Sequence, residues 1–209
     1  MTDHFALLDE PRRPWLDAEA VRAKFLARSA EVHPDRFHAA AEDERLAATN
    51  RFAALNAAHQ CLREPRERLR HLLELESGVA PADTQRIPAE MMDLFMTVGQ
   101  LCREVDQFLA ERARVTSPLL KVQWFARGME WTDRLNALQQ QLNARRDGLI
   151  SELQTLNAAW ATAPTLGSPE RRAALPLERL EQAYRAFSYL TRWTGQLQER
   201  VVQLSLGTI

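Results

Sequence analysis

The chain of 209 residues is poor in the residues that build disulfide frameworks, β-sheets and membrane spans. Its two cysteines, Cys61 and Cys102, lie far apart, and neither has a second cysteine or a histidine at ligand spacing, so neither a zinc site nor a disulfide framework is indicated. Glycine occurs only seven times, and alternating β-branched residues are almost absent. The first apolar run is too short for a signal peptide, and no later run approaches the roughly eighteen apolar residues of a membrane helix. We therefore expect a cytoplasmic protein with two free, buried thiols.

The chain also lacks an excess of either charge, since 27 basic residues nearly balance 28 acidic ones. No overall field favours nucleic acid or an anionic membrane. We find no nucleophile and base pair, phosphate loop or carboxylate pair at catalytic spacing, so we do not expect an enzyme. His4, His38, His59 and His71 form no pair at the i, i+4 spacing of helical metal ligands, so neither a metal nor another cofactor is expected.

Apolar residues recur at steps of three and four throughout the chain, and this periodicity predicts an all-α fold. A short helix is expected over residues 3–8. Asp17 is a suitable N-cap for a second helix that ends before Pro34. A third helix is predicted over 42–63, and a fourth starts at Pro65 and closes at Gly78. The short loop between the second and third helices predicts that they pack antiparallel.

After residue 77 the composition and the apolar periodicity of the chain change. Residues 78–88 are rich in glycine, proline and small polar residues and are predicted to be a linker between a first domain, 1–77, and a second, 89–209. The second domain carries three long heptad stripes, which predict an antiparallel, coiled-coil-like bundle of three helices. Its middle helix, from Pro118 to about Trp160, is longer than such a bundle needs, so its far end is expected to project.

The stretch "AEVHPDRFHA" places His33, Pro34 and Asp35 between the second and third helices. Pro34 ends the helix, because the residue before a proline is pushed out of the α region. An imidazole and a carboxylate held on a rigid turn can make directed hydrogen bonds to a partner. The simpler alternative is a loop histidine beside a helix-ending proline, with Asp35 capping the turn.

The setting of this tripeptide resembles the J-domain of DnaJ-type co-chaperones, in which a helical hairpin displays it at the tip. The "IN-x-A-x-x-x-L-x-x-P-x-x-R" run of J-domains is matched by Leu55, Asn56, Ala58, Leu62, Pro65 and Arg68. The stretches "DHFALLDEPRRPWLDAEAVRAKF", "HPDRF" and "LLELESG" look like the HscB branch, the J-proteins of iron-sulfur cluster assembly. The resemblance implies an N-terminal J-domain followed by the three-helix bundle; it is specific over residues 3–76 and architectural beyond them.

The resemblance implies docking of the hairpin on an ATP-bound chaperone of the DnaK or HscA type, from the heat shock protein 70 family, whose ATP hydrolysis it accelerates. The residues implied in docking are His33, Pro34, Asp35, Arg36, Arg22, Lys24 and Arg28. The three helix cations could instead form a merely solvated face. Arg28 departs from the family pattern, since an apolar core residue is usual there.

For the bundle, the resemblance implies binding of an IscU-type iron-sulfur scaffold protein through Met91, Met92 and Phe95, together with Phe187. Methionine and aromatic side chains suit an adaptable binding surface. Met91 and Phe187 also share the heptad stripes of the core, so either could instead be buried. The acidic residues usual beside this patch are missing, since residues 96–99 read "MTVG".

Three functions remain open from the sequence. The chain is a co-chaperone that delivers an IscU-type scaffold, a generic J-protein whose bundle holds another client, or a structural coiled-coil adaptor with a vestigial hairpin. With two separated cysteines, it is not expected to bind or build a cluster by itself.

Overall fold

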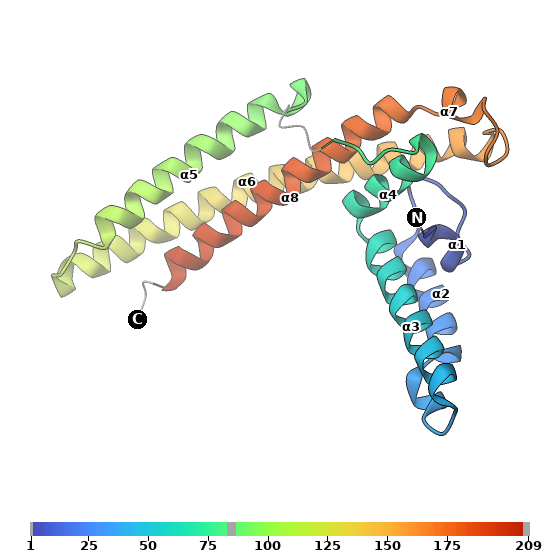
Figure 1. The fold of residues 1–209 in the computed structure, drawn as a ribbon. Coiled ribbons are helices and arrows are strands. Elements are labelled where there is room, and N and C mark those ends of the chain that lie inside the picture. Colours follow the sequence, from blue (N-terminus) through green and yellow to red (C-terminus); the bar gives the residue numbers. More distant parts are fainter. Residues whose placement is uncertain (1, 83–86, 207–209) are drawn as a thin grey trace. The chain divides into compact units, whose positions relative to one another are not determined.

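The computed structural model describes residues 2–82 and 87–206, and within them all regular structure is helical (Figure 1). The all-α prediction is thus confirmed. Residues 83–86 of the predicted linker, residues 207–209 of the predicted bundle and the side chains of 118–121 lie outside the described part. The elements are α1 (His4–Leu7), α2 (Ala18–Glu31), the 3-10 helix η1 (Pro34–Phe37), α3 (Glu42–Arg63), α4 (Pro65–Ser77), the 3-10 helix η2 (Ala89–Met91), α5 (Met92–Arg112), α6 (Pro118–Ala161), α7 (Arg171–Ala174) and α8 (Leu177–Leu206).

The chain forms two compact units. The first joins Met1–Thr84 with Ile150–Tyr184, and the second joins Gln85–Leu149 with Arg185–Ile209. These limits differ from the predicted division into 1–77, 78–88 and 89–209, because α6 and α8 each contribute to both units. The predicted domain boundaries are not tested by this division, so they stay a prediction.

The hairpin of the first unit consists of α2 and α3, which pack antiparallel (Figure 1). Asp17 caps α2 as predicted, since its side chain accepts a hydrogen bond of 2.8 Å from the backbone N–H of Ala20. Phe25 of α2 stacks on His59 of α3 with ring centroids 4.3 Å apart. The buried apolar residues of the pair are Val21, Ala48, Leu55, Ala58 and Leu62. The predicted bounds of both helices are therefore confirmed to within a few residues.

Arg68 of α4 holds the base of the hairpin. Its guanidinium is buried, with Nε donating to the carbonyl oxygen of Pro14 at 2.8 Å and Nη1 to that of Leu62 at 2.5 Å. Burial lowers the pKa of Arg68 to about 10, which leaves the side chain charged at neutral pH. One cation thus satisfies carbonyls from the loop before α2 and from the last turn of α3, where helical carbonyls have no partner of their own.

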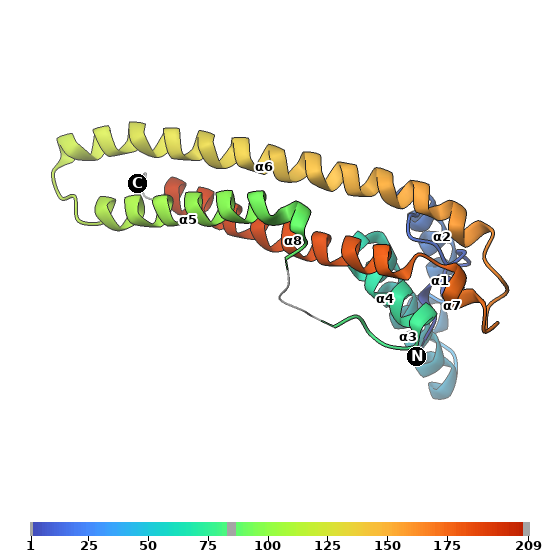
Figure 2. The same cartoon turned by 90° about the horizontal axis from the view of Figure 1, so that it is seen from above.

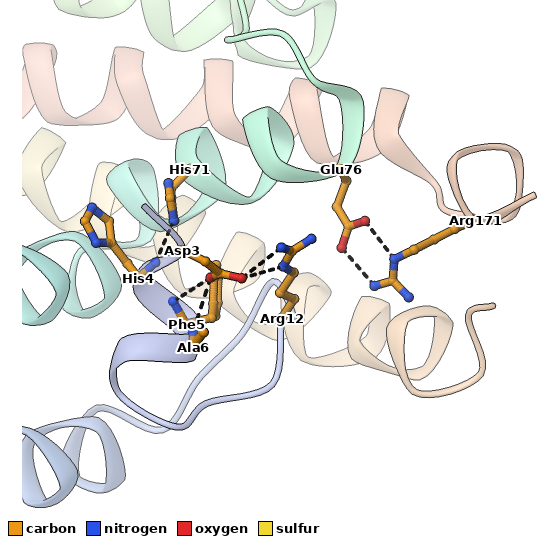
Figure 3. A network of polar contacts seen from close by, with 8 residues as sticks. All are labelled: Asp3, His4, Phe5, Ala6, Arg12, His71, Glu76 and Arg171. Atoms are coloured by element: carbon orange, nitrogen blue, oxygen red, sulfur yellow. Dashed lines mark hydrogen bonds and ion pairs between the residues drawn. The ribbon is translucent and has the colours of Figure 1, made fainter. Parts of the chain in front are cut away.

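The far end of α6 corrects one expectation, because it belongs to the first unit instead of projecting. Asn157 pairs with the backbone of Trp15, donating to its carbonyl at 3.0 Å and accepting from its N–H at 2.9 Å. Trp160 is buried nearby on the same helix. The short helix α7 carries Arg171, which pairs with both carboxylate oxygens of Glu76 at 2.8 Å (Figure 3).

The second unit contains α5 together with residues 118–149 of α6 and 185–206 of α8, which run alongside one another (Figure 2). Arg112 of α5 donates to two carbonyls near the end of α8, and Arg134 of α6 pairs with Glu104 of α5 at 2.7 Å. The predicted stripes supply the buried side chains, which include Val98, Leu101, Val105, Phe108, Leu135, Leu138, Leu142, Leu149, Leu190, Leu197 and Leu204. Within the described residues, no helix combines the length and apolarity needed to cross a membrane.

The buried guanidinium gives a test of the hairpin's base. Arg68→Met keeps much of the side-chain volume but leaves two buried carbonyls without donors, so we expect the free energy of unfolding to fall by about 2 to 4 kcal/mol. Arg70→Met, on an exposed position of the same helix, should change it by less than about 0.5 kcal/mol. Urea unfolding followed by circular dichroism measures both. Equal effects of the two substitutions would contradict this role of Arg68.

Candidate functional site

The turn at the hairpin tip is built by the end of α2 and by η1. After Glu31 the chain leaves the helix, and His33 takes an extended conformation with φ −62° and ψ 130°. His33 Nδ1 accepts a hydrogen bond of 3.3 Å from the backbone N–H of Asp35. In the neutral imidazole the proton therefore lies on Nε2, which leaves Nε2–H as a donor for a partner.

The His33 ring is held in place by α3. It meets Phe52 edge to face, with ring centroids 5.2 Å apart and an interplanar angle of 78°. The side chain of His33 nevertheless remains 46% exposed, and that of Asp35 is 89% exposed. The structure thus brings a donor and a carboxylate together at the surface of an anchored turn.

Arg36 links this turn to the end of α2. Its Nη1 donates to the carbonyl of Ala30 at 3.1 Å, in the last turn of α2, where a cation also complements the negative end of the helix dipole. His38 Nδ1 lies 2.8 Å from the carbonyl oxygen of Asp35. Arg36 is exposed, and its hydrogen bond to Ala30 positions the turn.

The predicted docking cations of α2 do not form one group. Lys24 Nζ lies 2.9 Å from the buried carboxylate of Glu10 and 2.6 Å from the carbonyl oxygen of Asp9. Arg28 faces the same loop, with Nη2 3.9 Å from Asp9 Oδ2. Arg22 is 64% exposed and approaches Glu19, one turn earlier, only to 4.0 Å. Arg22 is therefore the α2 cation most available to a partner, whereas Lys24 holds the loop after α1.

In the second unit, burial corrects the predicted scaffold-binding set. Met91 is fully buried and Phe187 is 3% exposed, because both heptad positions point into the core. Met92 and Phe95 are exposed at the start of α5, and Met96, which the sequence analysis did not include, is exposed beside them. We call Met92, Phe95 and Met96 the α5 patch. Phe95 also lies against the aromatic core, with its ring centroid 6.3 Å from that of Trp193.

A cluster of histidine and cysteine was missed by the sequence analysis. His4 of α1, Cys61 of α3 and His71 of α4 each place one potential ligand atom within 4.8 Å of the others. Burial lowers the pKa of His4, lowers that of His71 to about 4 and raises that of Cys61 to about 11. Positions 4, 61 and 71 form no recognisable spacing, so only the fold could reveal this arrangement.

The different contacts of Lys24 and Arg22 lead to a prediction. Lys24→Met should lower the free energy of unfolding by about 1 to 3 kcal/mol, because the buried Glu10 carboxylate loses its closest cation. Arg22→Met, on the same helix, should change it by less than about 0.5 kcal/mol. Chemical denaturation of the two variants compares them. If Arg22→Met proved the more destabilising, the structural role of Lys24 would be excluded.

Comparisons with known proteins find relatives in sequence and in fold. No protein-family model matches the chain. It is 38% identical over 95 residues to the co-chaperone protein HscB homolog of Chromobacterium violaceum, covering 43% of this chain and 52% of the relative. It is 39% identical over 93 residues to the HscB homolog of Bordetella petrii, covering 43% and 54%. The aligned part of the chain thus spans about half the length of the curated relatives it matches.

The fold is shared over nearly the whole chain. Chaperone HscB from Vibrio cholerae superposes with a TM-score of 0.58 at 21% identity, covering 97% of this chain and 99% of that one. Human co-chaperone protein HscB gives a TM-score of 0.57 at 17% identity, covering 97% and 81%. The chain is therefore similar to the HscB-type co-chaperones, with which it shares sequence over part of its length and an all-helical fold along nearly all of it.

Proposed function

We propose that this chain is a cytoplasmic co-chaperone whose hairpin tip docks on an ATP-bound chaperone of the DnaK or HscA type and stimulates its ATPase. The observation that carries the proposal is the turn of His33, Pro34 and Asp35, anchored on Phe52 and exposed at its polar groups, in a relative of the HscB-type co-chaperones. In this mechanism the chain catalyses nothing itself, because ATP is hydrolysed by the chaperone.

The geometry of the tip suits this role in two ways. His33 Nε2–H can donate a hydrogen bond and the Asp35 carboxylate can accept one. The partner is therefore recognised through directed, charge-assisted hydrogen bonds. The fixed φ of Pro34 and the ring contact of His33 reduce the conformational entropy lost on docking. Because such a tip buries little area, the complex should be transient and should weaken as salt increases.

The second unit is proposed to hold the client, an IscU-type iron-sulfur scaffold protein. The α5 patch supports this role, because Met92 and Phe95 are exposed apolar side chains and Phe95 is anchored beside Trp193. Exposed methionine and aromatic side chains adapt their packing to a partner and supply much of the binding energy at interfaces. One unit would then present the scaffold while the other triggers the ATPase.

A second candidate function is that of a J-protein with a different client. The observation that favours it is the C-terminal end of the α5 patch, where Met96 is exposed and Gly99 follows about one turn later. The HscB resemblance leads one to expect acidic residues here. Met96 and Gly99 select a different partner from an acidic pair, because neither residue offers a charge to complement.

Docking through the tip is tested by ATP turnover of a DnaK-type or HscA-type chaperone. His33→Gln and Asp35→Asn should each reduce the stimulation of ATP turnover by roughly ten- to a hundredfold. This range corresponds to the binding free energy lost with one charge-assisted hydrogen bond. Asp43→Asn, an exposed carboxylate in the first turn of α3, serves as the matched control and should behave as wild type. Unchanged stimulation by His33→Gln would rule the proposal out.

Client binding is tested by isothermal titration with an IscU-type scaffold. Met92→Ala and Phe95→Ala should each weaken binding about tenfold or more, since exposed apolar anchors are being truncated. Phe125→Ala, an exposed aromatic on α6, should leave the affinity unchanged. A wild-type chain that stimulates the ATPase but does not bind the scaffold would favour the second candidate function.

A further inference from the structure

The cluster of His4, Cys61 and His71 joins three helices of the first unit. The rings of His4 and His71 lie with centroids 4.4 Å apart, and His71 Nε2 accepts a hydrogen bond of 3.1 Å from the backbone N–H of His4 (Figure 3). One nitrogen from each histidine and the sulfur of Cys61 all lie within 4.8 Å of one another. Among the residues that the structure describes, no other three histidine, cysteine or acidic side chains converge in this way.

One atom of the cluster is unsatisfied. His4 Nδ1 is buried and has no hydrogen-bond partner among the described residues. A buried polar atom without a partner is rare in folded proteins, because it loses its interaction with water and gains nothing in return. His71 Nε2, by contrast, already accepts the backbone N–H of His4, and a ligand at that atom would replace this hydrogen bond.

From this arrangement we propose that His4, Cys61 and His71 form a binding site for a thiophilic divalent cation, with Zn²⁺ as the ion that fits best. Two imidazole nitrogens and one thiolate are the donors that zinc prefers, whereas magnesium and calcium take oxygen ligands. Three protein ligands leave a fourth tetrahedral position for water. On binding, the Cys61 thiol releases its proton to solvent and the sulfur becomes the ligand; no electron is transferred.

The distances allow this with small side-chain movements. Zinc bonds of about 2.0 to 2.3 Å place tetrahedral ligand atoms roughly 3.5 Å apart, so the widest pair of the cluster must approach by about 1 Å. Rotation about the side-chain bonds of two histidines can supply such a shift. The backbone need not move, because α1, α3 and α4 are already packed through buried Phe5, Leu62 and Leu72.

The expected consequence is a cross-link that stabilises the first unit without being required for its folding. A metal that binds the folded state adds its binding free energy to stability, and here it would tie α1 to both α3 and α4. This site lies outside the docking tip and the α5 patch. Its presence or absence is therefore independent of the proposed co-chaperone function.

Cobalt titration of the full chain tests the site, because Co²⁺ reports its ligands by absorption. We expect one Co²⁺ per chain, with a thiolate-to-cobalt charge-transfer band that Zn²⁺ displaces. Cys61→Ser should lose that band, and His71→Asn should bind about tenfold or more weakly. Cys102→Ser, the other free thiol, is the matched control and should keep the full spectrum. Absence of the band in folded wild type, or its survival in Cys61→Ser, would overturn the proposal.

A second measurement avoids substitution altogether. With Zn²⁺ present, alkylation of Cys61 in the wild-type chain, followed by mass spectrometry, should slow about tenfold or more relative to chelator, whereas alkylation of Cys102 should not change. The thermal unfolding midpoint of the wild type should also rise with zinc. Equal effects of zinc on both thiols would contradict a site at Cys61.

Discussion

Pro34 sets the limit of α2, and the arrangement of the hairpin follows from that limit. A proline disfavours helical backbone in the residue before it, so α2 ends at Glu31 and His33 is extended. The chain then turns through η1, and α3 packs back against α2. In this way a local steric rule places an imidazole and a carboxylate at the end of two packed helices, where both are exposed.

The tip can act as a rigid group only if the hairpin behind it is fixed. Buried Arg68 supplies donors to two carbonyls at the base of the hairpin, and Lys24 holds the loop after α1 through Glu10. Segments distant in sequence add to this base, since Asn157 binds Trp15 and Arg171 binds Glu76. Much of the polar network of the first unit therefore positions helices, whereas the side chains of His33, Asp35 and Arg22 stay exposed, as does Arg36.

The parts of the fold with local signals could be predicted from the sequence. Asp17, Pro34, Pro65 and Gly78 each mark a helix end by their own backbone chemistry, and the bounds agree with the structure. Properties that depend on packing could not be predicted in the same way. The heptad stripes left open whether Met91 and Phe187 are core or surface residues, and only the packing shows that both are buried while Met92 stays exposed. The position of the far end of α6 and the cluster around Cys61 depend on contacts between distant segments, which leave no periodic pattern.

The most direct test of the account is hydrogen exchange of the full chain mixed with an ATP-bound DnaK-type or HscA-type chaperone. The account predicts slower exchange in residues 33–37 and in the stretch of α2 around Arg22, with little change in α5. Raising the salt concentration should diminish this protection. Protection confined to α5, or none at the tip while the chaperone is bound, would contradict the assignment of the turn at His33, Pro34 and Asp35 as the docking site.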